Sequence, residues 1–116
     1  MSEINLNNKY FKGVENYDDG DFNQDTVFHY RQDKTIVWAT FQGGGTRFGT
    51  VVGYIDEKES IRMVWQYLSV LDKFISGTTV SEVEILLDGR YRLHEKWTIS
   101  KPEPLRGTSV IEEISQ

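Results

Sequence analysis

Apolar side chains recur at every second position over most of this 116-residue chain, and this period limits the folds open to it. The longest clean example is residues 60–70, in which Ile61, Met63, Trp65 and Tyr67 alternate with a second set that contains charged and amide side chains. Successive side chains of a β-strand point to opposite faces, so the pattern predicts a strand with one packed face. We find no run with the period of an amphipathic helix. The chain is therefore predicted to be all-β.

Extended segments of this kind follow one another along the chain, separated by short connections. Three glycines at 43–45 and the pair Asp88-Gly89 are strong hairpin signals, because glycine enters the positive-φ conformations of tight turns. Residues 17–25 are dense in turn formers and are predicted to be a loop, whereas residues 1–8 are polar and are predicted to fray. The predicted strands are residues 9–15, 26–32, 35–42, 46–55, 60–70, 74–87, 90–100 and 107–114.

A meander of about eight antiparallel strands closes most easily into a barrel, because closure removes the exposed strand edges. We therefore predict a single domain, residues 1–116, that forms an antiparallel up-and-down β-barrel. Gly49 and Gly53 lie inside a predicted strand and indicate a bend, a bulge or a close backbone approach, and Gly77 indicates a bend in its own strand. A barrel of this size has room for side chains or one small ligand.

The composition excludes several classes of function. The chain carries 18 acidic and 13 basic residues, and this negative balance argues against binding to nucleic acid or to an anionic membrane. It contains no cysteine, which excludes disulfides, thiol nucleophiles and thiolate metal sites. The N-terminal ten residues lack the apolar core of a signal peptide, so a cytoplasmic location is expected.

One charged residue interrupts an otherwise apolar strand face. In residues 90–100 the face that contains Leu93 and Trp97 also carries Glu95 between them. An unpaired buried carboxylate is too costly to keep, so Glu95 needs a partner, a proton or a wet cavity. Glu95 is therefore the strongest indication in the sequence of where a ligand would bind.

Three interpretations of Glu95 are open from the sequence. It is a pocket carboxylate that binds a ligand amine or hydroxyl, or that acts as a general acid or base. Alternatively it forms a structural ion pair with an interior arginine, for which Arg31, Arg47 and Arg106 are the candidates. In the third interpretation a β-bulge turns the side chain outward.

Five aromatic residues on the alternating faces are the other candidates for a site. They either line a ligand cavity, with a few polar groups that orient the ligand, or simply pack the core. The five are Trp38, Trp65, Tyr67, Tyr30 and Trp97.

No metal, cofactor or catalytic nucleophile is predicted. His29 and His94 are the two histidines, and each lies on the charged face of its strand. His94 and its neighbour Glu95 should face opposite sides, so they do not form a metal site together. The chain has no Gly-x-Ser-x-Gly motif.

Three segments, residues 28–32, 92–97 and 107–114, resemble those of a group of small bacterial lipocalin-like (calycin-type) proteins. The resemblance covers nearly the whole chain and implies a lipocalin-like meander barrel. Some members carry the label N-acetylglutamate synthase. Such an acetyltransferase needs a glycine-rich loop that opens a helix, whose amides hold a pyrophosphate. Residues 42–47 are the candidate loop here, but they lead into a predicted strand at 48–52, so this activity is not predicted.

The leading functional hypothesis is a non-enzymatic module that binds a modest, partly apolar ligand in the barrel mouth, with Glu95 as the polar anchor. The predicted ligand-binding residues are Glu95, Trp97, Trp65, Tyr67, Trp38, Tyr30 and Arg31. One alternative is an enzyme that uses Glu95 as general acid or base, with Tyr30 or Arg31 steadying charge. Another is a structural protein that forms a homodimer through residues 35–42, which are apolar on both faces.

Overall fold

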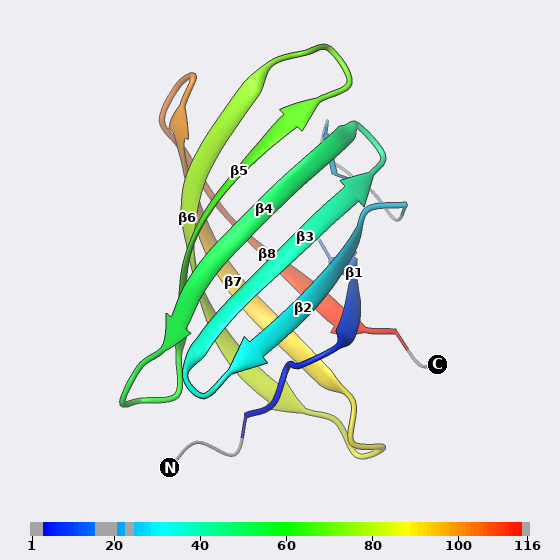
Figure 1. Cartoon of the computed structure of the whole chain (residues 1–116), viewed down its shortest axis with the longest axis vertical. Helices are drawn as coiled ribbons and strands as arrows, with labels where there is room; N and C mark the ends of the chain where they lie inside the picture. The colour runs from blue at the N-terminus through cyan, green and yellow to red at the C-terminus, as the bar shows by residue number, and fades with distance from the viewer. Residues whose placement is uncertain (1–3, 16–20, 23–24, 115–116) are drawn as a thin grey trace.

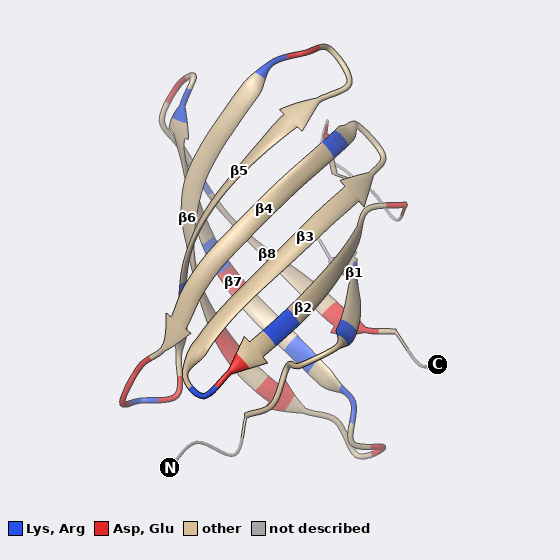
Figure 2. Cartoon of the chain, in the orientation of Figure 1, with Lys and Arg blue, Asp and Glu red and all other residues tan. Residues whose placement is uncertain are grey.

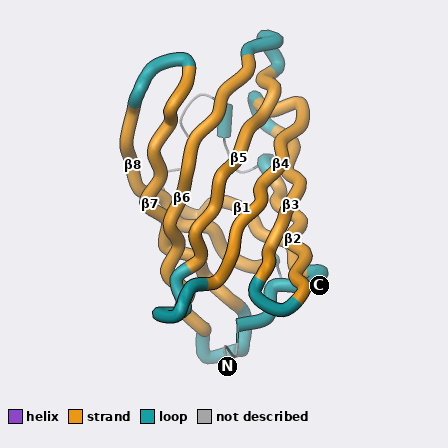
Figure 3. The backbone as a smooth tube through the Cα atoms, turned by 60° about the vertical axis from the view of Figure 1, so that its left-hand side comes forward, coloured by secondary structure: helices purple, strands orange, loops and turns teal. Residues whose placement is uncertain are grey.

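Eight antiparallel strands form a closed barrel in which each strand pairs with its neighbours in sequence and β8 returns to β1 (Figure 1). The computed structural model describes residues 4–15, 21–22 and 25–114. Every regular element in this part of the chain is a strand (Figure 3), as the alternation predicts. The strands are β1 (Lys9–Glu15), β2 (Val27–Asp33), β3 (Ile36–Gly43), β4 (Thr46–Ile55), β5 (Ile61–Ser69), β6 (Phe74–Ile85), β7 (Tyr91–Lys101) and β8 (Leu105–Glu113).

Strand boundaries follow the sequence closely, with one informative difference. β8 begins at Leu105 rather than at Gly107, because Leu105 and Arg106 already pair with Ile99 and Thr98 of β7. The predicted bend at Gly77 coincides with a shift in the β6–β7 register. In the described ranges no helix has the length and apolar character needed to cross a membrane.

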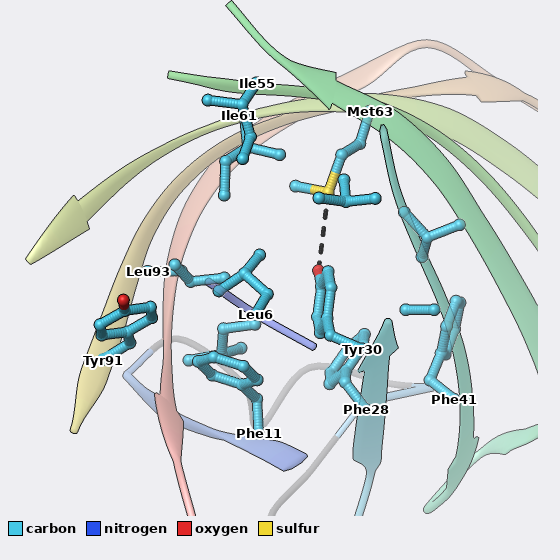
Figure 4. Close-up of a cluster of buried hydrophobic side chains, with 14 of the residues drawn as sticks. Leu6, Phe11, Phe28, Tyr30, Phe41, Ile55, Ile61, Met63, Tyr91 and Leu93 are labelled. Atoms are coloured by element: carbon cyan, nitrogen blue, oxygen red, sulfur yellow. Dashed lines mark hydrogen bonds between the residues drawn. The ribbon is translucent and has the colours of Figure 1, made fainter. Parts of the chain in front are cut away.

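The two ends of the barrel differ. The end that carries the β2–β3, β4–β5 and β6–β7 turns is here named the base, and the opposite end is named the mouth, uppermost in Figure 1. The base is filled by fully buried apolar side chains (Figure 4). Its members include Leu6, Phe11, Val37, Ile61, Leu93 and Ile111.

The N-terminal segment closes the base, which corrects the prediction that residues 1–8 fray. Ile4 and Leu6 are buried in the core, and Figure 4 shows Leu6 beside Leu93. The Leu6 amide donates to Gln32 Oε1 at 2.8 Å, and Gln32 Nε2 donates to the Ile4 carbonyl at 3.0 Å. Two apolar side chains in a polar stretch therefore hold this segment against the barrel, and the half-buried Gln32 amide satisfies backbone groups of the segment. Residues 1–3 lie outside the described residues.

Candidate functional site

The mouth half of the barrel contains a cavity of about 250 Å³. Each strand from β2 to β8 contributes at least one side chain to its wall, and where a strand contributes several they are an even number of residues apart, because such residues share a face. The lining residues are Asp21, Phe22, Phe28, Tyr30, Phe41, Val51, Met63, Trp65, Tyr67, Thr79, Glu95, Trp97, Ile99, Leu105 and Ser109.

Two tryptophans form part of the cavity wall, and each lies against a glycine of the next strand. Trp65 is opposite Gly77 in the β5–β6 register, and Trp97 is opposite Gly107 in the β7–β8 register. A Cβ at Gly77 would come within 2.6 Å of the Trp65 ring, and one at Gly107 within 2.1 Å of the Trp97 ring. Both rings therefore lie over glycine backbone against the wall, which leaves the centre of the barrel open.

A third pair of the same kind stands on the other side of the cavity. Phe41 is opposite Gly49 in the β3–β4 register, and a Cβ at Gly49 would meet the Phe41 ring at 2.2 Å. The predicted close approach at Gly49 is thus confirmed. Gly53, also predicted to allow a close approach, lies against the Arg62 carbonyl in the same way.

Asp21 and Phe22, from the connection between β1 and β2, cover part of the mouth. The Tyr67 hydroxyl donates to Asp21 Oδ2 at 2.9 Å, and the Phe22 ring packs edge-on against the Tyr67 ring at a centroid distance of 5.1 Å. The Asp21 carbonyl accepts hydrogen bonds from the Gly45 amide at 3.0 Å and from Thr46 Oγ1 at 3.1 Å. Backbone and side-chain contacts together hold these two residues over the cavity.

Glu95 lies on the floor of the cavity and is 7% exposed. Its carboxylate accepts hydrogen bonds from Ser109 Oγ at 3.2 Å and from Ser81 Oγ at 3.4 Å. The Tyr30 hydroxyl, also on the cavity, donates to Met63 Sδ at 3.6 Å (Figure 4). Burial raises the pKa of Tyr30 well above its usual range, and the charge of Glu95 raises it further. Tyr30 is therefore a neutral phenol at physiological pH.

The predicted ion pair between Glu95 and an interior arginine is wrong for each of its three candidates. Arg31, Arg47 and Arg106 are all exposed on the outside of the barrel. Arg31 Nε donates to Asn7 Oδ1 at 3.3 Å, and Arg47 pairs with Asp72. The alternative in which a bulge turns Glu95 outward is also wrong, because the side chain is buried and its β7–β8 register with Ser109 is regular.

The structure brings five of the seven predicted site residues to the cavity, and Trp38 and Arg31 are the exceptions. Trp38 is 40% exposed on the outer face of β3, while its neighbours Val37 and Ala39 point inward. Arg31 points outward on β2 because Tyr30 beside it points inward. The prediction that these two residues line the site is therefore wrong, and the outward position of Arg31 removes it from the enzymatic hypothesis. The five on the cavity are Glu95, Trp97, Trp65, Tyr67 and Tyr30.

The histidines lie apart on the outer surface. His29 Nε2 is 2.9 Å from Asn8 Oδ1, and the His29 ring stacks on Tyr10. His94 Nε2 is 2.8 Å from Glu84 Oε1. In the ranges that the structure describes, no three acidic or histidine side chains group in a way that would hold a metal ion. Most of the acidic segment predicted as a loop, residues 17–25, lies outside those ranges, namely residues 17–20 and 23–24.

Comparison with known proteins agrees with this architecture. The family model described as Avidin-like protein matches residues 4–114, which is nearly the whole chain. The chain belongs to the avidin-like family. An avidin-like barrel is of the calycin type, so the match supports the calycin-like resemblance and a small-molecule-binding fold without addressing the N-acetylglutamate synthase label. No curated protein matches the chain.

The sequence did not indicate that Asp21 and Phe22, which lie between β1 and β2, would line the avidin-like cavity. Asp21 and Phe22 lie in a stretch whose only local signal is turn formation, and Tyr67, their partner, is 46 residues away. Phe28 and Met63 were detectable, because each lies on the apolar side of an alternating segment, whereas Phe41 lies in residues 35–42, which are apolar on both faces.

Proposed function

We propose that this avidin-like chain is a non-enzymatic module that binds a small molecule in the cavity at the barrel mouth. The observation that carries the proposal is a cavity with aromatic walls that has a buried carboxylate on its floor. Concave, mostly apolar spaces with a few convergent polar groups are the usual form of a ligand site. No chemical step is needed to account for this arrangement.

The size of the cavity sets the size of the ligand. Its volume of about 250 Å³ is below the range of roughly 300–1,000 Å³ that holds drug-sized molecules. The ligand is therefore modest, of the order of one or two small rings with a short substituent. Trp65, Trp97 and Tyr67 contact its apolar body, and Glu95 accepts hydrogen bonds from its polar group.

A thermal-shift screen tests the proposal. The panel consists of small amines, neutral amphiphiles and biotin, the ligand of avidins. A compound that binds the folded chain at 100 times its Kd adds about 2.7 kcal/mol to the unfolding free energy, so the melting temperature rises by several degrees. Glu95→Gln keeps the shape of the side chain and removes its charge, and it is expected to cut the shift produced by an amine by more than half.

The matched control is Glu57→Gln, which removes a carboxylate from an exposed turn far from the cavity. It is expected to leave every shift unchanged. If Glu95→Gln and Glu57→Gln behave alike, Glu95 is not the anchor. A panel with no stabilising compound would count against the binding function as a whole.

We also propose that the outer face of β3, β4 and β5 is a homodimer interface. Trp38, Val52 and Val64 are paired across these three strands and are 40%, 52% and 53% exposed. Figure 2 shows β3 free of charge and β4 with a single cation near its start. An exposed apolar surface of this kind is typical of a protein contact, and avidin-like proteins often form oligomers.

Analytical sedimentation tests the dimer. The chain is expected to dimerise reversibly, and Val52→Glu, which places a charge at the centre of this face, is expected to shift it to the monomer. A wild-type chain that stays monomeric over the whole accessible concentration range would contradict the proposal.

A further inference from the structure

We infer that the cavity selects cationic ligands over neutral and anionic ligands of the same shape, with the positive group of the ligand beside Glu95. The inference rests on the proposed binding function and names the class of ligand that this function serves.

The charges of the cavity lining are the first observation. Among the described residues that line it, the ionisable ones are Asp21 at the mouth, Glu95 on the floor and the phenols of Tyr30 and Tyr67, and none is a lysine, arginine or histidine. Tyr30 is neutral, so the acidic groups that the described lining presents are carboxylates at two levels of the cavity. A low-dielectric wall strengthens the field of these carboxylates inside the cavity, and the field attracts a positive guest and repels a negative one.

The described lysine and arginine residues near the mouth lie outside the cavity lining. Arg47 pairs with Asp72, and Lys101 and Arg106 are exposed on the outside of the barrel.

The aromatic walls favour the same class of ligand. Because Gly77 and Gly107 let the Trp65 and Trp97 rings lie against the wall, the indole faces border the cavity. The face of an indole is the electron-rich side of the ring and is the best aromatic partner for a cation. Glu95 lies two residues before Trp97 on β7 and points to the same side. A cationic group of the ligand on the floor of the cavity is therefore expected to contact both the Glu95 carboxylate and the Trp97 indole of β7.

Three probes of nearly equal shape test the inference: phenethylamine, phenethyl alcohol and phenylacetate. They carry a positive, a neutral and a negative group on the same aromatic body. Affinities are measured at neutral pH by calorimetry on the wild-type chain. Phenethylamine is expected to bind about tenfold more tightly than phenethyl alcohol, and phenylacetate to bind more weakly than either.

Glu95→Gln is expected to bring the amine and the alcohol to affinities within about threefold of each other, while the affinity for the alcohol changes little. Asp21→Asn is expected to reduce the preference for the amine by a smaller factor, since Asp21 lies farther along the cavity, at the mouth. Glu57→Gln is again the control and should leave the ratio of amine to alcohol unchanged. Circular dichroism of each variant checks that the barrel is folded.

The affinities of the three probes for the wild-type chain test the selection for cations separately from the binding function. If the alcohol or phenylacetate binds as tightly as the amine, the selection for cations is wrong although the binding function stands. If no probe and no compound of the thermal-shift panel binds, the binding function itself is wrong, and the inference fails with it.

Discussion

Gly107→Ala is expected to lower the affinity for phenethylamine by more than tenfold. A Cβ at this position would lie 2.1 Å from Cζ2 of Trp97 and within 2.7 Å of two further ring atoms. The indole is rigid and must move as a whole, and the open side of the ring is the cavity. The alanine therefore pushes Trp97 into the space that the ligand needs. Overpacking of this kind also lowers the unfolding free energy, by about 1–3 kcal/mol.

Calorimetry with phenethylamine and denaturant unfolding measure the two effects on Gly107→Ala separately. Thr108→Ala is the matched control, because Thr108 is the next residue of β8 and points outward to solvent. It should leave affinity and stability within error of the wild type. Full affinity in Gly107→Ala would show that the position of the Trp97 ring does not set the room for the ligand.

Phe11→Ala is expected to lower the unfolding free energy by about 3–5 kcal/mol, the largest stability effect we predict. Phe11 is fully buried at the base and packs edge-on against Tyr30 at a centroid distance of 5.3 Å. β1, which carries it, closes the barrel against β2 and β8. The substitution removes a large apolar side chain and leaves a cavity that rigid strands on both sides cannot fill. Guanidinium unfolding followed by circular dichroism gives the change.

Phe74→Ala is the control for Phe11→Ala. The Phe74 side chain is 80% exposed at the start of β6, and its loss should change the unfolding free energy by no more than about 0.5 kcal/mol. Equal effects of the two substitutions would mean that the base is not the packed half of the barrel.

The alternation in the sequence was sufficient to predict the barrel and much of its interior. In residues 60–70 and 90–100 one face is apolar and the other contains charged residues. The period-two alternation is therefore enough to predict that Trp65, Tyr67, Glu95 and Trp97 point into the barrel. Glu95 was identifiable for the same reason, since a single carboxylate on an apolar face has few structural explanations.

Other features depend on contacts that no local pattern contains. Residues 35–42 are apolar on both faces, so nothing in them shows that Ala39 points inward and Trp38 outward. The inward side of β3 is fixed only when the sheet closes. Ile4 and Leu6 stand alone in a polar stretch, and their burial depends on a hydrogen bond to Gln32 of β2. Asp21 is placed by Tyr67 in the same way.

The most direct test of a ligand in the barrel mouth uses the three tryptophans as reporters. Trp65 and Trp97 border the cavity, while Trp38 lies on the outer face of the barrel. The indole N–H signals in a two-dimensional NMR spectrum, assigned with single Trp→Phe variants, are followed during titration with phenethylamine. A ligand in the barrel mouth is expected to give saturable shifts of the Trp65 and Trp97 signals and to leave the Trp38 signal constant. Shifts confined to Trp38, or no saturable shift at Trp65 and Trp97, would contradict binding in the barrel mouth.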